Sequence, residues 1–334
     1  MKEVILAIET SCDDTSAAIA INGIIKSNII KSQGVHSNYG GVVPEISSRE
    51  HQKNIILVVE EALKSAKVKK NDLNAISFTI GPGLLGSLLV GCSFAKSLSF
   101  ALNLPLIGVD HMKAHVLSNF IDNPIPDFPF ICLTVSGGHT QLVLVKDFLN
   151  MKIIGETLDD AVGEAFDKSA KILGIEYPGG PIIDKLSQKG NPLKFKFSKP
   201  KVSDLNFSFS GIKTSILYFV KSQMEKDPEF IEKNLNDISA SIQYSLVEIL
   251  IEKLIKAANK YKISNIAIAG GVSANSLLRK EIEKVKTIYN WTTFIPKIEY
   301  CTDNAAMIAI AAHYYIKEKR FETINVCPNP RLNF

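Results

Sequence analysis

Cysteine is scarce in this chain, and none of it is arranged as a metal or redox pair. Five cysteines occur in 334 residues, and no two of them form a Cys-x-x-Cys motif. An odd number of widely spaced cysteines does not suit the disulfide framework that stabilises many secreted domains. The composition therefore predicts a protein of a reducing compartment, and we expect a cytoplasmic location.

A strong charge imbalance and a targeting segment are also missing. The formal net charge is +4 and 22% of the residues are charged, which is ordinary for a globular protein and neither requires nor excludes nucleic-acid binding. At the N-terminus, MKEVILAIET places an acid directly ahead of a short apolar run. That pattern is typical of a first β-strand and not of a signal peptide.

One stretch, residues 84–104, is apolar enough to resemble a membrane span. A span needs about 20 mainly apolar residues, so length alone does not exclude one. Lys96 near the centre, several serines and a Gly-Pro-Gly start favour a buried helix instead, because a charge near the centre of a span is costly.

The two halves of the sequence repeat one plan, which predicts an α/β protein with two lobes. Each half opens with two strands joined by a short polar turn, at residues 4–8 and 16–21 and again at 130–135 and 140–145. Helices then alternate with short strands. We expect an internal duplication with a central cleft where ligands bind.

The predicted domain boundaries follow from this repeat. An N-terminal α/β lobe is expected over residues 1–125 and a C-terminal α/β lobe over 126–304, with a mostly helical insertion at about 185–260. The helix at about 305–320 is expected to pack back on the first lobe.

Two histidines lie four residues apart in the stretch DHMKAHVLS, residues 110–118. Asp110 is a good N-cap residue for a helix that runs toward Phe120. On that helix His111 and His115 share one face and could hold one transition metal. Such a pair alone is more often two surface residues, so a third ligand would have to come from elsewhere.

Polar turns follow several predicted strands. The acids after the first strand suit simple Asx-turn chemistry. The glycines of the turn at residues 136–139 would allow backbone N–H groups to approach a ligand closely. A second glycine-rich turn at 270–279 opens a helix whose positive end suits a sugar or phosphate. Asp303 stands at the start of a later helix, where N-capping would be a sufficient explanation.

From Lys185 to Lys201 the sequence has six lysines and no acid. The centre of this stretch, residues 194–198, alternates lysine and phenylalanine as a β-strand does. Two interpretations remain open: a basic surface that contacts a phosphate backbone, or an edge strand protected by lysines.

Nine segments together resemble one family, the tRNA N6-adenosine threonylcarbamoyltransferases of the TsaD type, formerly described as O-sialoglycoprotein endopeptidases. In order, the segments are AIETSCDDTSAAI, YGGVVPEISSREH, GPGLLGSLLVG, HMKAH, VSGGHTQLVLV, DDAVGEAFDKSAKILG with YPGGP, FSFSGIKT, GGVSANSLLR and YCTDNAAMIA. They run from residue 7 to about residue 309. One departure is Lys113, where the family usually has Glu; on a helix this side chain would point away from the histidine face.

The resemblance implies the two-lobed ATPase fold of actin, sugar kinases and heat-shock chaperones. The implied activity is transfer of a threonylcarbamoyl group from threonylcarbamoyl-AMP to N6 of the adenosine beside the anticodon in tRNAs that read ANN codons, with release of AMP. It also implies one divalent metal per subunit, with Fe²⁺ preferred and Zn²⁺ as the alternative. The implied partners are tRNA, a paralogous TsaB-type subunit and a TsaE-type ATPase, with no membrane.

Site residues are carried over by their positions in these motifs. His111, His115 and Asp303 would be the metal ligands. The adenylate substrate would be bound by Thr134, Val135, Ser136, Gly137, Gly138, His139, Asp167, Gly180, Asp184 and Asn275. The general base is left open between Asp13, Asp14 and His139.

Other functions compete with this one. A metalloprotease would fit the histidine spacing, but Met112 stands where HExxH zinc proteases carry their glutamate base. An ATPase or kinase would fit the same scaffold, although such enzymes usually hold Mg²⁺ through carboxylates and phosphates. A non-enzymatic scaffold subunit could dock partners through the apolar helices near residues 55–63 and 84–104.

Overall fold

The computed structural model describes residues 3–200 and 202–334, which form two compact units. The first unit comprises Met1–Ile125 and Pro296–Phe334, and the second comprises Pro126–Ile295. The C-terminal segment therefore belongs to the same unit as the N-terminal strands.

Each unit is built on a five-stranded mixed sheet, and the two sheets have the same topology. The first has the order β3-β2-β1-β4-β5 and contains β1 (Val4–Glu9), β2 (Asp14–Ile21), β3 (Ile24–Ser32), β4 (Ala75–Gly81) and β5 (Leu106–Asp110). The second has the order β10-β9-β6-β7-β8 and contains β6 (Phe130–Val135), β7 (Thr140–Val145), β8 (Met151–Glu156), β9 (Asn265–Ala269) and β10 (Thr292–Phe294). In both, three consecutive strands pair antiparallel, one parallel strand adds beside the first of them, and a second parallel strand adds beside that one. This confirms the α/β class and the repeated, hairpin-led plan.

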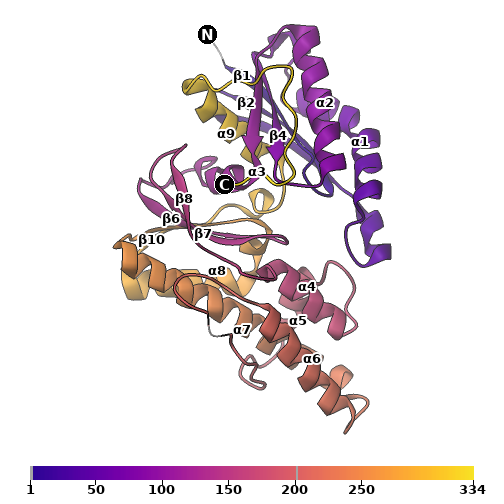
Figure 1. The fold of residues 1–334 in the computed structure, drawn as a ribbon, viewed down its shortest axis with the longest axis vertical. Helices are drawn as coiled ribbons and strands as arrows, with labels where there is room; N and C mark the ends of the chain where they lie inside the picture. The colour runs from indigo at the N-terminus through magenta and orange to yellow at the C-terminus, as the bar shows by residue number, and fades with distance from the viewer. Residues whose placement is uncertain (1–2, 201) are drawn as a thin grey trace. The chain divides into compact units, whose positions relative to one another are not determined.

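Helices cover both faces of the first sheet, which explains why every residue of β1 is buried. Leu6 and Ile8 belong to the apolar cluster that α1 (Pro44–Ser65) and α2 (Leu85–Leu102) close on one face. On the opposite face the Ser16 hydroxyl accepts a hydrogen bond of 2.9 Å from the backbone N–H of Ala305, at the start of α9 (Ala305–Lys317). Figure 1 shows α9 on the other side of the strands from α1 and α2.

The second unit packs its helices into one apolar cluster with the second sheet. These helices are α4 (Val162–Ile172), α5 (Gly179–Ser187), α6 (Ser210–Met224), α7 (Phe230–Tyr261) and α8 (Ser276–Tyr289). The remaining elements are α3 (His111–Leu117) and the short 3₁₀ helices η1 (Gly34–Tyr39), η2 (Lys70–Asp72), η3 (Ser118–Phe120), η4 (Gly271–Ala274) and η5 (Ile298–Tyr300).

The predicted strand at residues 194–198 is wrong, because this segment is irregular. Phe197 is buried and Phe195 packs partly buried against the aromatic rings of α6 and α7, while Lys194 and Lys196 are exposed. The alternation of buried and exposed side chains is therefore real, but it arises from packing on helices and not from a sheet edge. Lys201 lies outside the described residues.

Among the described residues, α2 is the helix long and apolar enough to cross a membrane, with a mean hydropathy of 1.5. One third of that window is buried. Leu88, Cys92 and Ala95 face the core, whereas Leu85 and Phe100 are exposed. The helix thus covers the sheet with one face and presents an apolar surface with the other.

Candidate functional site

Three parallel strands of the first sheet end beside one another in polar residues. Glu9 closes β1, Thr79 lies near the end of the neighbouring β4, and His111 follows β5 directly. Carboxyl ends of parallel strands are the usual place for ligands in open α/β sheets. The first unit therefore collects its candidate ligands at this edge.

The predicted histidine helix forms as expected. Asp110 caps α3, since its side chain accepts a hydrogen bond of 3.0 Å from the backbone N–H of Lys113. The rings of His111 and His115 lie edge to face with their centroids 4.7 Å apart. The Lys113 ammonium lies 5.5 Å from the centre of the Phe334 ring.

Asp303 joins the two histidines from the segment before α9. Its Oδ1 lies 3.1 Å from His115 Nε2 and 3.4 Å from His111 Nε2. The capping explanation for Asp303 is wrong, because α9 is capped by Asn304, whose side chain accepts from the Met307 N–H at 3.0 Å. The Asp303 carboxylate is thus left to face the imidazoles.

The protonation of these three side chains decides how they can bind a cation. Burial would raise the pKa of Asp303, but His111 and His115 hold it well below its usual value. Burial lowers the pKa of His115. Burial also disfavours a charged His111, yet Asp303 and Glu9 raise its pKa well above the ordinary value. A metal ion binding here would therefore displace a proton from His111.

The donor set fits a transition metal. One nitrogen from each imidazole and one carboxylate oxygen lie within 4.8 Å of one another. Two histidines and one carboxylate with open positions suit Fe²⁺ or Zn²⁺ better than Mg²⁺, which prefers oxygen ligands. In residues 3–200 and 202–334 no second group of this kind is found.

Two of the three candidate bases lie where the first hairpin turns: Asp13 ends the turn between β1 and β2, and Asp14 is the first residue of β2. Burial raises the pKa of Asp14 to about 7, with nearby acids adding to the shift and a hydrogen bond from Ser32 opposing it. A carboxylate of that pKa can accept a proton near neutral pH.

The same turn is fixed by hydrogen bonds to one carbonyl. The Cys12 carbonyl oxygen accepts from the hydroxyls of Ser47 and Ser87 and lies 3.0 Å from His51 Nε2. Burial raises the pKa of the Cys12 thiol, so this cysteine is not an activated nucleophile. Helices α1 and α2 therefore hold the acidic turn in place.

In the second unit the turn between β6 and β7 exposes its backbone. The Ser136 N–H donates to the His139 carbonyl at 2.8 Å, and the His139 N–H donates to Ser136 Oγ at 3.0 Å. Gly137 and Gly138 are exposed, and a Cβ added at either would meet no heavy atom within 4 Å. Thr134 and Val135 are fully buried in β6, so the turn itself offers the accessible groups.

This turn rests on the start of α4. A Cβ on Gly163 would lie only 2.6 Å from the Ser136 carbonyl oxygen, so glycine is required for the close approach. Val162 donates its backbone N–H to Thr140 Oγ1 at 2.9 Å. The N-terminus of α4 thereby supports the exposed glycines.

Asp167, Gly180 and Asp184 are linked through helix N-termini. Asp167 Oδ1 accepts from the backbone N–H groups of Gly179 and Gly180 at 2.9 and 3.1 Å, which caps α5. Burial raises the pKa of Asp167, against the effect of these two bonds. Asp184 accepts from the hydroxyl and the backbone N–H of Ser276 at 2.5 and 3.1 Å. The predicted substrate residues of α4, α5 and α8 are thus brought together.

Asn275 caps α8 and has a partner that the sequence did not reveal. Its Oδ1 accepts from the Leu278 N–H at 3.0 Å, and its Nδ2 donates to Gln243 Oε1 at 2.8 Å. Gln243 is buried on α7 and donates in turn to Ser187 Oγ at 2.8 Å. A glutamine in the middle of a long helix carries no local signal of such a role.

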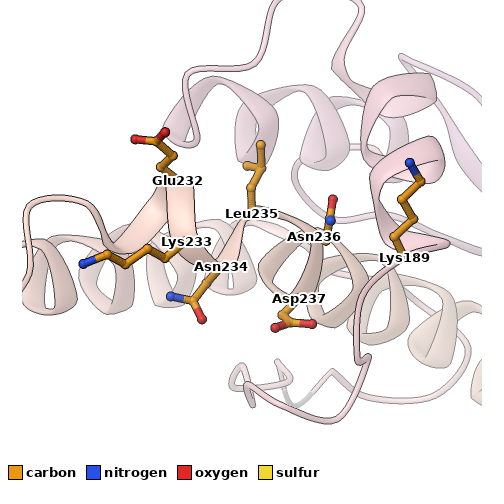
Figure 2. Close-up of a pocket in the computed structure, with 7 residues that line it drawn as sticks. All are labelled: Lys189, Glu232, Lys233, Asn234, Leu235, Asn236 and Asp237. Carbon is orange, nitrogen blue, oxygen red and sulfur yellow. The ribbon is translucent and has the colours of Figure 1, made fainter.

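A surface pocket of about 300 Å³ elsewhere in the second unit is lined by Lys189 and residues 232–237. Its side chains point to different sides of the chain (Figure 2). Lys233 pairs with Asp227 at 2.9 Å and Asp237 with Lys194 at 2.7 Å. This pocket therefore has the character of a surface held by ion pairs, and none of the predicted metal or adenylate residues lines it, although Lys189 belongs to the 185–201 stretch.

Comparison with known proteins gives one consistent family. The model of the TsaD family, described as tRNA N6-adenosine threonylcarbamoyltransferase, matches residues 23–310. Proteins named tRNA N6-adenosine threonylcarbamoyltransferase are similar throughout: 58% identity with that of Christiangramia forsetii, over 99% of this chain and 98% of the relative, and 54% with that of Cytophaga hutchinsonii, over 99% and 97%.

Solved structures are similar in fold at low sequence identity. Full-length HypF in its phosphate- and nucleotide-bound form superposes with a TM-score of 0.63 at 12% identity, over 96% of this chain and 47% of that one. Component A of (R)-2-hydroxyglutaryl-CoA dehydratase from Acidaminococcus fermentans gives 0.55 at 16%, over 95% and 98%. These similarities confirm the predicted ATPase-type fold.

Proposed function

Since the chain belongs to the family of tRNA N6-adenosine threonylcarbamoyltransferases, it is a tRNA-modifying transferase, and we propose how its residues divide the work. The donor in this proposal is threonylcarbamoyl-AMP and the acceptor is N6 of the adenosine beside the anticodon in tRNAs that read ANN codons. The N6 nitrogen bonds to the carbamoyl carbon, the bond from that carbon to the phosphate oxygen of AMP breaks, and one proton leaves N6.

The His111, His115 and Asp303 cluster would hold one divalent metal, Fe²⁺ in preference to Zn²⁺. The observation that supports it is the convergence of three ligand atoms within 4.8 Å. When bound, such an ion supplies Lewis-acid polarisation of the threonylcarbamoyl carbonyl. The chain's own contribution is to present two imidazoles and one carboxylate while leaving coordination positions open.

In the second unit the Gly137 and Gly138 N–H groups would bind the phosphate of the adenylate, since the Ser136 N–H already donates to the His139 carbonyl. Their support is the exposed glycine backbone above the start of α4. Asp167, Gly180, Asp184 and Asn275 would orient the nucleoside. Because their hydrogen bonds cap α5 and α8, these residues also keep the two helix ends fixed.

Asp14 is our choice for the proton acceptor among the three candidates. Its pKa of about 7 suits general-base catalysis at neutral pH. Asp13 and His139 remain alternatives for this step.

Three lysines of the 185–201 stretch would contact tRNA. Lys194 is paired with Asp237 at 2.7 Å and Lys199 with Glu252 at 2.6 Å, so part of their charge is neutralised within the protein. Lys185, Lys189 and Lys196 are exposed and form no ion pair within the described part of the chain. We assign the phosphate contacts to these three.

A paralogous TsaB-type subunit would dock on the exposed apolar faces of α1 and α2. Ile56 and Leu57 of α1 are 55% and 56% exposed, and Leu85, Leu89 and Phe100 of α2 are 51%, 46% and 79% exposed. Exposed apolar patches of this kind often mark protein interfaces. A TsaE-type ATPase and a cytoplasmic location complete the proposal.

The transfer reaction itself tests the proposed function. Threonylcarbamoyl-AMP, unmodified tRNA, the partner proteins and this protein should together yield threonylcarbamoylated adenosine, detected by mass spectrometry of digested tRNA. Cleavage of casein that disappears in His111→Ala would instead support a protease.

A further inference from the structure

We propose that Glu9 is a positioning residue of the metal site, whose carboxylate accepts a hydrogen bond from His111 Nδ1 and so keeps His111 Nε2 directed toward Asp303. The inference rests on the proposed metal site and adds to it a residue outside the three ligands.

Glu9 is completely buried at the end of β1, and both of its oxygens are engaged. Oε1 accepts from the backbone N–H of Ser11 at 2.5 Å. Oε2 accepts from Thr79 Oγ1 at 2.5 Å and lies 3.1 Å from His111 Nδ1. The far nitrogen of the same ring, Nε2, lies 3.4 Å from Asp303 Oδ1.

A buried carboxylate is costly unless donors satisfy it. In the described residues Glu9 has no lysine or arginine partner, and His111 is its one ion-pair partner. The arrangement follows from the sheet: Glu9 pairs with Ser16 across β1 and β2, so its side chain shares the face on which α9 begins. The carboxylate is therefore placed behind His111 by the strand register.

The two histidines are held differently. His115 Nδ1 is buried without a hydrogen-bond partner, so the ring of His115 is oriented by its helix, by Asp303 and by the edge contact with His111. His111 Nδ1 has a second neighbour, Ser11 Oγ at 3.2 Å. A carboxylate is a stronger acceptor than a hydroxyl, so the ring N–H donates to Glu9.

Outer carboxylates of this kind fix the tautomer and the orientation of a ligating histidine and make it more basic. Glu9→Gln should remove that support. An amide has one oxygen, so its NH₂ group must face either the Ser11 N–H or the pair of donors from Thr79 and His111. In the first case the Ser11 N–H lacks an acceptor, and in the second case Thr79 and His111 both lose theirs.

Cobalt titration measures the effect without any assay of activity. Co²⁺ is added to the metal-free protein and its visible absorption is followed for the wild type, Glu9→Gln, Ser11→Ala, Thr79→Val and His115→Ala. Glu9→Gln should weaken Co²⁺ affinity about 10- to 100-fold, while the matched Ser11→Ala, which removes the neutral neighbour of the same nitrogen, should stay close to wild type.

The possible results test the role of Glu9 and the metal site separately. Wild-type affinity in a folded Glu9→Gln protein, with binding lost in His115→Ala, would overturn the role of Glu9 and leave the metal site intact. No Co²⁺ binding by the wild type, or unchanged binding by His115→Ala, would overturn the metal site itself. If Glu9→Gln does not fold, Thr79→Val decides: it keeps the carboxylate but removes one bond that orients it, so affinity should fall, and wild-type affinity would overturn the proposal.

Discussion

Asp303 Oδ1 lies 3.1 Å from His115 Nε2, although the two residues are 188 positions apart in the sequence. The contact joins α3 to the segment that precedes α9, inside the first unit. The candidate metal site is therefore complete only when the C-terminal segment is packed on the first sheet.

Metal binding should stabilise the first unit against heat. A ligand that binds only the folded state raises stability by about 2.7 kcal/mol at 100 times its Kd. Added Fe²⁺ or Zn²⁺ should raise the Tm of the wild type, and Asp303→Asn should abolish that rise. The surface variant Asp122→Asn, which loses a pair with Lys297, should keep it. An equal rise in Asp303→Asn would contradict the assignment of this ligand.

The Asp14→Asn substitution should slow transfer but stabilise the folded protein above neutral pH. Because burial raises the folded-state pKa of Asp14 to about 7 from 3.8, its contribution to stability is fully present below the unfolded pKa and is lost as the pH rises through 7. In the metal-free protein, the variant should gain stability relative to the wild type at pH 8, by up to about 4 kcal/mol.

The pH dependence of transfer tests whether Asp14 is the general base. With Asp14 as the base, kcat/KM should rise with pH through the pKa of Asp14, which is about 7 without a metal and lower beside a bound cation, and the Asp14→Asn variant should be slow at every pH. A variant that keeps wild-type transfer and the same profile would return the role to Asp13 or His139.

The exposed lysines of the 185–201 stretch should contribute to tRNA affinity. A Lys185→Ala, Lys189→Ala, Lys196→Ala variant should bind tRNA more weakly and reduce the salt slope by up to about 2 to 3, because each contacted phosphate contributes about 0.7–0.9. Filter binding across a range of salt concentrations measures this.

A control with the same charge change should replace three exposed lysines of the first unit, Lys64, Lys67 and Lys70. If both variants lose affinity equally, net charge accounts for the effect and the 185–201 stretch has no special part in it.

The apolar face of α2 should carry the affinity for the TsaB-type subunit. Leu89→Lys places a charge in that face and should weaken binding at least about tenfold, as losses at interface hot spots do. Ile288→Lys, at a 64% exposed position on α8, is the matched control and should bind normally. Calorimetry with purified subunits would contradict the proposed surface if Leu89→Lys bound as tightly as the wild type.

The sequence predicts correctly those parts of the fold that depend on residues close together in the chain. The four-residue spacing and the Asp110 cap predicted α3 and its histidine face correctly. Three strands, β3, β8 and β10, were not predicted. For β3 the signal existed: Asn22 and Gly23 adopt positive φ of 51° and 75°, as a two-residue hairpin turn requires, and Asn-Gly is its typical sequence.

Contacts between residues far apart in the sequence could not be predicted from local patterns. The spacing of His111 and His115 could not supply Asp303, which only the family resemblance placed at the site. Glu9 and Gln243 were missed because their roles depend on what other elements bring beside them, namely His111 and Asn275. The same dependence misled the interpretation of residues 194–198, whose alternation reflects aromatic packing on α6 and α7.

The central claim is that the His111, His115 and Asp303 site performs threonylcarbamoyl transfer to tRNA. Mass spectrometry of digested tRNA, after incubation with threonylcarbamoyl-AMP, the partner proteins and Fe²⁺, measures it most directly. The wild type should yield threonylcarbamoylated adenosine, and a folded His115→Ala, Asp303→Ala double variant should yield almost none. Full product from that double variant, or none from the metal-loaded wild type, would contradict the account.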